Sequence, residues 1–234
     1  MREILTYGKR EFIVEIQFNK RKSFSITVYH DLRIVAKAPL GSSIKDIRKG
    51  LNKRASWISK QIDYFDQFQP LPPERKYISG ETHYYLGRQY RLIINRGKTQ
   101  RVKLIGGFFT MELPNPSDRE KAKKIMQDWY SSHAKELLTK HLKRLLPEFT
   151  RLGVLEPEIR FRRMKKRWGS CSQKGIIILN TELVKVPIHC IDYVIIHELC
   201  HLKYLKHNKE FYHLMRKILP DWEKRKERLE KAVL

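Results

Sequence analysis

The sequence predicts an α+β protein, with a β-rich N-terminal half that holds one helix and a C-terminal region built around a HExxH helix. Two observations carry this prediction. Short segments rich in β-branched and aromatic residues fill much of the first half, and longer segments with helical spacing of apolar residues dominate the second. With 234 residues, the chain suits one large domain or two small ones. This change from strand-like to helix-like residue patterns predicts a β-rich region at 1–105 and a second domain at 106–234.

In the first half, the expected elements follow one another closely. Three strands, at 11–18, 23–29 and 33–39, precede a helix that opens at Ser43, whose hydroxyl suits an N-cap, and runs to about Phe68. A proline-rich break follows at 69–76. Four short strands separated by glycines are then expected within residues 82–114.

The second half is expected to be mainly helical. A helix is predicted from about 115 to 146, followed by two strands around a turn at about 158–168 and 175–180. A further helix is expected after Pro187, and another after His207, to about Leu229. Trp57 and Tyr64 are expected to be buried, whereas His133 and His141 lie in a basic context typical of exposed residues.

The chain is strongly basic, with 49 Lys and Arg against 25 Asp and Glu, for a net charge of +24. Such a charge predicts attraction to polyanions, including nucleic acid. The segment at 160–167, RFRRMKKR, is either a solvated surface or the rim of a cleft that attracts an acidic substrate or a nucleic acid. No zinc-finger, homeodomain or RNA-recognition signature accompanies it.

Three cysteines and no CxxC pair argue against a disulfide framework and against a cysteine-based structural zinc site. We expect no signal peptide, because the N-terminal segment has no apolar core, and no membrane span, because no stretch reaches roughly 18 apolar residues. The expectation is a cytoplasmic protein without a membrane partner.

The segment 197–207, HELCHLKYLKH, contains the candidate catalytic and metal-binding residues. His197 and His201 are four residues apart and share one face of a helix, where two imidazoles can bind one cation. Glu198 lies beside that face and can take a proton from a metal-bound water, while His207 supplies a third ligand. The pattern predicts one Zn²⁺ per chain. In the alternative interpretation, the histidines are hydrogen-bonded core residues.

Several neighbours are candidates for a supporting role. Trp168 and Ser170 either line the substrate cleft or form a tight turn packed on the core. Asp192 either orients a ligand histidine or compensates the N-terminal charge of the helix. The candidate oxyanion donors are Tyr204, Arg167 and the backbone NH groups of residues 169–171.

The run from Trp168 to Phe211 resembles the YgjP-like metallopeptidase family. The matching blocks are Trp168-Gly169-Ser170-Cys171, Gly175, Asp192-Tyr193-Val194, His197-Glu198-Leu199, His201, His207-Asn208 and Phe211. This resemblance implies a zincin-like fold in the C-terminal region, with His197, His201 and His207 as zinc ligands and Glu198 as the base.

The function expected from these residues is a zinc-dependent hydrolase, in particular a peptidase that cleaves an amide bond by Glu-assisted attack of zinc-bound water on a peptide or protein substrate. The alternative is a basic protein associated with nucleic acid in which the metal is structural, or a protease acting on DNA-bound proteins.

Overall fold

The protein is described from a computed structural model that covers residues 1–29, 31–67, 69, 74–164 and 167–232. The chain forms two compact units, residues 1–73 and residues 74–233. The mixed α+β class predicted from the sequence is confirmed. None of the helices in the described residues has the length and apolar character needed to cross a lipid bilayer.

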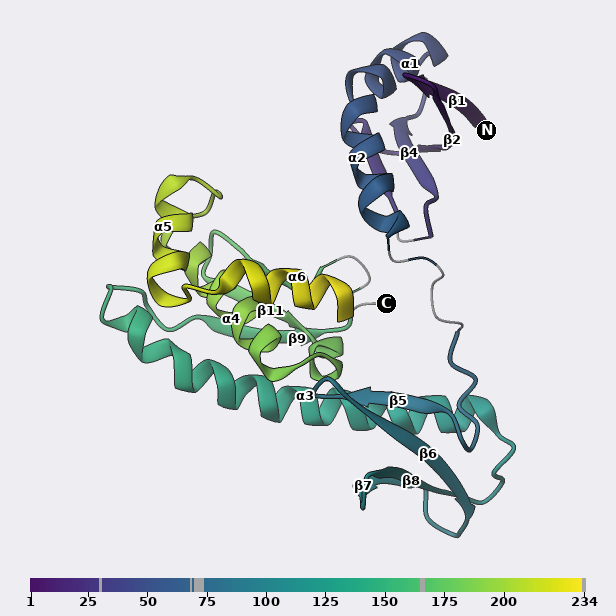
Figure 1. Cartoon of the computed structure of the whole chain (residues 1–234), viewed down its shortest axis with the longest axis vertical. Helices are drawn as coiled ribbons and strands as arrows, with labels where there is room; N and C mark the ends of the chain where they lie inside the picture. Colours follow the sequence, from purple (N-terminus) through teal and green to yellow (C-terminus); the bar gives the residue numbers. More distant parts are fainter. Residues whose placement is uncertain (30, 68, 70–73, 165–166, 233–234) are drawn as a thin grey trace. The chain divides into compact units, whose positions relative to one another are not determined.

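The first unit is a four-stranded sheet covered on one face by two helices (Figure 1). The strand order is β1-β2-β4-β3, with β2 and β4 parallel and the outer pairs antiparallel. Its core is formed where Val14, Ile16 and Ala36 meet Ile47 and Ile58 of the helices. The elements are β1 (Arg2–Tyr7), β2 (Arg10–Asn19), β3 (Ser25–Val28), β4 (Ile34–Pro39), α1 (Ile44–Lys53) and α2 (Ala55–Asp66).

Two expectations for this unit need correction. The single helix predicted from Ser43 to Phe68 is two helices, because the backbone of Arg54 leaves the helical region between them. Trp57 was expected in the core but is 40% exposed, because it lies outside the stripe of α2 that Ala55, Ile58 and Ile62 bury. The predicted N-cap is confirmed: the Ser43 hydroxyl accepts a hydrogen bond from the Asp46 NH at 3.1 Å.

The second unit begins with another four-stranded sheet, packed along one long helix, α3 (Figure 1). This sheet has the order β5-β6-β8-β7, and α3 (Arg119–Thr150) starts at the N-cap Asp118. Pro147 was expected to lie beyond the helix, but the helix continues to Thr150, because Phe149 in its last turn is fully buried in the core. The sheet consists of β5 (Thr82–Tyr85), β6 (Arg88–Arg96), β7 (Arg101–Ile105) and β8 (Phe108–Leu113).

A three-stranded sheet and three helices complete this unit. Its strand order is β10-β11-β9, in which β10 and β11 form a hairpin and β9 runs parallel to β11. The two strands expected around one turn are therefore three. The elements are β9 (Glu158–Arg162), β10 (Gly169–Cys171), β11 (Ile176–Asn180), the 3₁₀ helix η1 (Thr181–Lys185), α4 (Ile188–Lys203), α5 (Lys209–Ile218) and α6 (Trp222–Ala232).

The expected boundary between residues 105 and 106 falls inside the β5–β8 sheet, between β7 and β8. These strands are paired through residues 101–105 and 108–112, so the chain cannot be divided there. One apolar cluster also runs from Leu92 in β6 to Leu229 in α6. The two compact units instead part between residues 73 and 74.

Candidate metal centre

Helix α4 places the first two histidines. It begins directly after Pro187, and Ile191, Val194 and Ile195 on its apolar sides are buried. His197 and His201, one turn apart, are only partly buried and share one face of the helix, as their spacing predicts. Burial of the other faces therefore fixes the direction in which both imidazoles point.

His207 joins them because the chain leaves the helix at the expected place. Tyr204 is the C-cap with an extended backbone, and Asn208 caps α5 by accepting a hydrogen bond from the Phe211 NH at 3.0 Å. The ring nitrogens of His197, His201 and His207 offered to a metal all lie within 4.8 Å of one another. The Nε2 atoms of His197 and His207 are 3.1 Å apart.

This arrangement fits a metal ion of the expected kind. Imidazole nitrogens bound tetrahedrally to one zinc ion lie about 3.3 Å apart, and catalytic zinc sites take three protein ligands. Burial lowers the pKa of His197 to about 3, with the neighbouring His201 and His207 acting in the same direction. Burial also lowers the pKa of His207. The neutral imidazole that a metal requires is therefore the favoured form.

Two contacts orient the imidazoles. The backbone carbonyl of Tyr204 lies 3.1 Å from His201 Nδ1 and accepts its proton, which leaves the other ring nitrogen as the donor to a metal. Phe211 is fully buried, and its ring centre lies 5.1, 4.7 and 4.7 Å from those of His197, His201 and His207. Phe211 thus packs against the whole cluster, a role its place in the sequence pattern did not indicate.

Glu198 has an unusual environment for a carboxylate. It is 5% exposed, and within the described part of the chain its Oε2 has no hydrogen-bond partner. Burial raises its pKa to about 7, while the positive charge of Arg167 acts in the opposite direction. A buried carboxylate without a partner costs stability, and such groups gather at functional sites. Glu198 therefore suits proton transfer near neutral pH.

Strand β10 passes directly beside this carboxylate. A Cβ added to Gly169 would lie 2.5 Å from Glu198 Oε1 and 2.7 Å from its Cγ, so only glycine fits between the strand and the helix here. The buried amide of Asn180 holds the preceding segment by donating to the carbonyls of Met164 and Arg167 at 2.8 and 2.9 Å. Sequence reasoning missed Asn180, and it named Gly169 for its backbone NH without indicating its contact with Glu198.

The other residues predicted to support the site differ in how they relate to Glu198 and the histidines. Arg167 acts on Glu198 through its charge, and Trp168 is half-buried against the core. Ser170 follows Gly169 on β10, so alternation along the strand turns its side chain away from Glu198. Tyr204 contributes its carbonyl to His201.

Asp192 is bonded to α3, and within the described residues it makes no hydrogen bond to the three histidines of the cluster. Its Oδ1 accepts hydrogen bonds from His141 Nδ1 and from an Arg144 Nη, both at 2.7 Å and both on α3. The expected role in orienting a ligand histidine is therefore not what the structure shows, and His141 is not the exposed residue expected. The contact joins α3 to α4.

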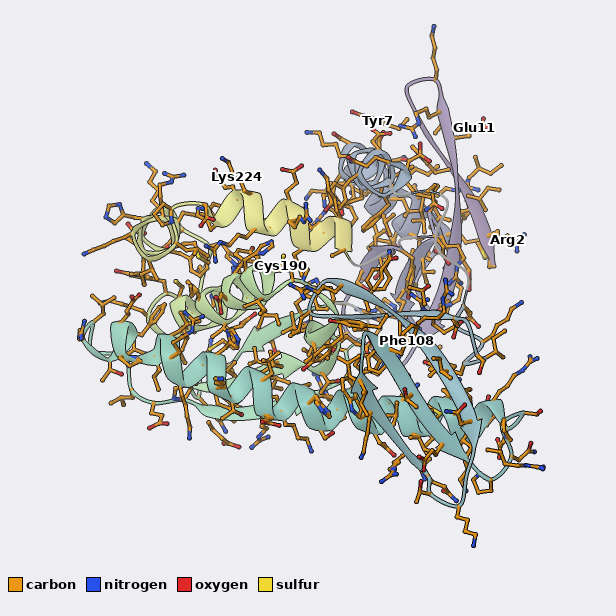
Figure 2. The ribbon with its side chains drawn as sticks, turned by 60° about the horizontal axis from the view of Figure 1, so that its bottom comes forward. Arg2, Tyr7, Glu11, Phe108, Cys190 and Lys224 are labelled. Carbon is orange, nitrogen blue, oxygen red and sulfur yellow. The ribbon has the colours of Figure 1, made fainter. Side chains whose placement is uncertain are left out.

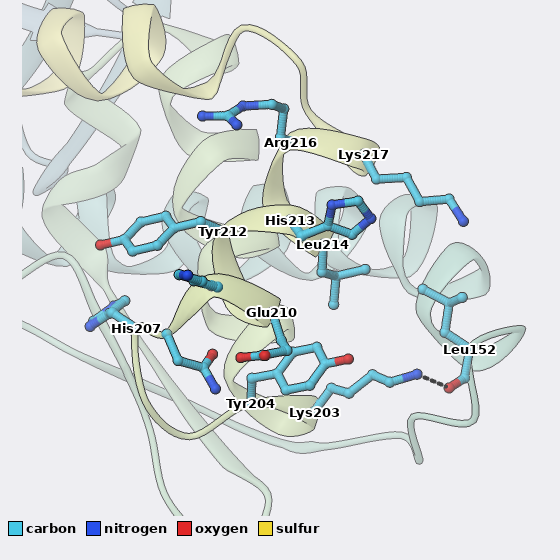
Figure 3. Close-up of a pocket in the computed structure, with 12 residues that line it drawn as sticks. Leu152, Lys203, Tyr204, His207, Glu210, Tyr212, His213, Leu214, Arg216 and Lys217 are labelled. Atoms are coloured by element: carbon cyan, nitrogen blue, oxygen red, sulfur yellow. Dashed lines mark hydrogen bonds between the residues drawn. The ribbon is translucent and has the colours of Figure 1, made fainter.

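A pocket of about 950 Å³ lies beside His207, along α5 (Figure 3). Its lining is basic: Lys203, Lys209, Arg216 and Lys217 contribute cations, against one carboxylate from Glu210. Lys203 Nζ donates to the Leu152 carbonyl at 2.9 Å, which ties α4 to the end of α3.

The family comparison agrees with the site. The sequence model of the YgjP-like metallopeptidase domain matches residues 22–232. No curated protein matches the chain.

Solved structures that match include the metallopeptidase zymogen of Pyrococcus abyssi abylysin, 24% identical over 39% of this chain and 90% of that chain, with a TM-score of 0.36. They also include the zymogen of Methanocaldococcus jannaschii jannalysin, 18% identical over 42% of this chain and 97% of that chain, with a TM-score of 0.37. The family match covers most of the chain, so the chain belongs to the YgjP-like metallopeptidase family. The resemblance found in the sequence is confirmed, and the protein is a metal-dependent peptidase by family.

Proposed function

From membership in the YgjP-like family, we propose that the protein is a zinc-dependent peptidase, with one Zn²⁺ per chain held by His197, His201 and His207 and with Glu198 as the general base. The observation that carries the proposal is the buried, unpartnered Glu198 carboxylate next to three clustered imidazoles. A structural metal would not require such a carboxylate beside it.

The chain's own residues supply the remaining chemistry. When bound, a zinc ion with three imidazole ligands lowers the pKa of a water in its open position and polarises a carbonyl oxygen. Glu198 accepts a proton from the attacking water and passes it to the leaving amine nitrogen. Its raised pKa, about 7, suits both halves of that transfer at neutral pH.

The substrate is proposed to lie along β10. In the order β10-β11-β9, β10 is an edge strand, and an extended peptide can add to such an edge by main-chain hydrogen bonds. Because Gly169 contacts Glu198, a peptide on this edge would bring an amide bond close to the base. Arg167 and the backbone NH groups of β10 are then the nearest candidates to stabilise the oxyanion.

The basic pocket beside His207 would receive part of the same substrate. Its excess of cations over the single carboxylate of Glu210 favours an acidic side chain or a terminal carboxylate of the substrate.

The basic segment at 160–167 contributes fewer unpaired positive charges than its composition suggests. Arg160 pairs with Glu158 at 2.6 Å and Arg163 with Glu182 at 3.4 Å, while residues 165–166 lie outside the described residues.

The test is cleavage of a mixed peptide library, read by mass spectrometry, with the zinc-loaded wild type and Glu198→Gln. We expect cleavage by the wild type that a chelator abolishes and that the variant lacks while still binding zinc. Wild-type turnover by a zinc-loaded Glu198→Gln protein would refute Glu198 as the base.

A further inference from the structure

The outer face of the β5–β8 sheet carries an arrangement that peptide hydrolysis does not use. The inner face of the sheet packs on α3, where Phe109 contacts Trp129 with ring centres 4.9 Å apart. Residues between the inward positions point outward. The pairing places them in rows across the strands: Thr82–Arg91–Phe108–Ile105, Ile93–Thr110–Lys103 and Asn95–Glu112–Arg101.

This face is open and positively charged. Arg91, Arg101 and Lys103 are exposed. Glu112 is the one carboxylate in these rows, and Arg101 already pairs with it at 3.3 Å. Within the described part of the chain, neither Arg91 nor Lys103 forms a salt bridge, although the charge of Lys103 acts on Glu112. Arg91 on β6 and Lys103 on β7 stand one row apart on either side of β8, so they suit a ligand with separated negative charges that crosses the sheet.

An exposed aromatic ring lies among these cations. Phe108 is 41% exposed, directly opposite Arg91 on β6 and Ile105 on β7, and Ile105 is itself 58% exposed. No ring or cation of the described residues stacks on Phe108. At the β5 edge of the same face, the Arg75 guanidinium lies 5.7 Å above the Tyr84 ring. Figure 2 shows the sheet with its side chains, and Phe108 is labelled there.

We propose that this outer face binds single-stranded nucleic acid, with phosphates at Arg91 and Lys103 and a base stacked on Phe108. Charge complementarity selects a polyanion, and the exposed ring selects one that offers free π-faces. A duplex hides its base faces in the stack, so a flat sheet with an aromatic ring favours an unpaired strand. A membrane surface or a polyphosphate would use the cations but not the ring.

Base stacking is tested with the full chain and a fluorescein-labelled oligo-dT of about 20 nucleotides, beside an abasic strand of the same length, by fluorescence anisotropy. Phe108→Ala should weaken binding of oligo-dT roughly tenfold and leave the abasic strand unaffected. Phe18→Ala removes a ring of matched exposure (40%) in the first unit, and it should change the affinity for neither oligo-dT nor the abasic strand. Phe108→Leu keeps the apolar bulk and should lose affinity as Phe108→Ala does. Equal binding of oligo-dT by wild type and both Phe108 variants would overturn the proposal.

The phosphate contacts are tested by salt dependence. Arg91→Glu with Lys103→Glu should reduce the slope of log affinity against log salt by about 1.4, because each lost contact to a single strand removes about 0.7. Lys135→Glu with Lys143→Glu, two exposed cations of α3, makes the same change in net charge and should leave the slope close to that of the wild type. An equal loss in both double variants would mean non-specific attraction, and a duplex bound as tightly as oligo-dT would contradict a single-strand site. Unchanged zinc content of every variant would show that the catalytic unit remains folded.

Discussion

The two four-stranded sheets of this protein have the same topology but different surroundings. In each, a central parallel pair, β2 with β4 or β6 with β8, is flanked by two antiparallel edge strands. The first sheet is backed by two short helices of 10 and 12 residues, and the second by the single 32-residue α3.

That difference in helix length connects the second sheet to the candidate site. In the N-terminal half of α3, the Tyr130 hydroxyl donates to the Tyr84 carbonyl of β5 at 2.7 Å. In its C-terminal half, His141 reaches Asp192 of α4. The first sheet has no such extension, and its helices bury their apolar faces within their own unit. The same strand order thus forms a separate unit in one case and supports the candidate metal centre in the other.

The outer faces differ as well. On β1 and β2, outward Arg2 lies opposite Glu15, and Thr6 opposite Glu11, so charges of both signs are present. On the second sheet, cations dominate. Shared topology therefore does not explain the positive charge on the outer face of the β5–β8 sheet, which depends on the residues that point outward.

A carboxylate substitution in each unit tests whether only the second unit takes part in catalysis. Glu198→Gln should lower kcat by roughly a thousandfold, because a general base contributes about 10² to 10⁴ in rate. Glu11→Gln, on the outer face of the first sheet, should leave kcat unchanged. The measurement is the peptide cleavage rate of each zinc-loaded variant, compared with that of the wild type. A large loss in Glu11→Gln would show that the first unit takes part in catalysis.

Acid should weaken the second unit through His83 on the inner face of β5. Burial lowers the pKa of His83 to about 4, although nearby Glu81 acts in the opposite direction. The neutral form is favoured in the folded state, so its stabilisation is complete above pH 6.5 and is lost as pH falls towards 4. The loss is roughly 3 kcal/mol. Urea unfolding of wild type and His83→Gln between pH 7.5 and 4 should show their difference shrinking by that amount. A difference independent of pH would contradict it.

A pair of glycine substitutions compares close contacts in the two units. Gly169→Ala should push the Glu198 carboxylate aside and lower kcat/KM roughly a hundredfold while zinc stays bound. Gly50→Ala in α1 meets only the ring edge of Phe24, at 2.9 Å, which can shift. That variant should keep wild-type kcat/KM. Equal activity of the two variants would show that Gly169 does not position the base.

The smallest expected effect concerns helix caps. Ser43→Ala in α1 and Asp118→Ala in α3 each remove a side chain that accepts a backbone NH, at 3.1 and 3.0 Å. Each should lower the free energy of unfolding by about 1 kcal/mol. Ser43→Ala should leave peptidase activity unchanged, and reduced activity at full zinc occupancy would argue against independent units.

Local pattern predicted much of this structure. The helical spacing before His197 and the N-cap at Ser43 depend on neighbours in sequence, and both helices begin where expected. The position of His207 followed from the same short segment, and the structure places it with His197 and His201.

What escaped prediction depends on residues far apart in the chain. Asn180 acts on the carbonyls of Met164 and Arg167, and Gly169 matters only because α4 brings Glu198 against it. His141 and Asp192 are 51 residues apart, so nothing local indicates their contact. The boundary near residue 105 failed for the same reason, since the pairing of β7 with β8 and their shared core with α3 arise from tertiary packing.

We propose that His197, His201 and His207 together bind one metal ion. The most direct test is the metal content, by inductively coupled plasma mass spectrometry, of wild type, His201→Ala and His213→Ala after zinc loading and desalting. His213 is an exposed histidine on α5, in the pocket but outside the cluster. About one zinc per chain in the wild type and in His213→Ala, with loss in His201→Ala, is the predicted result. Equal zinc in all three, or none in any, would contradict a three-histidine metal centre.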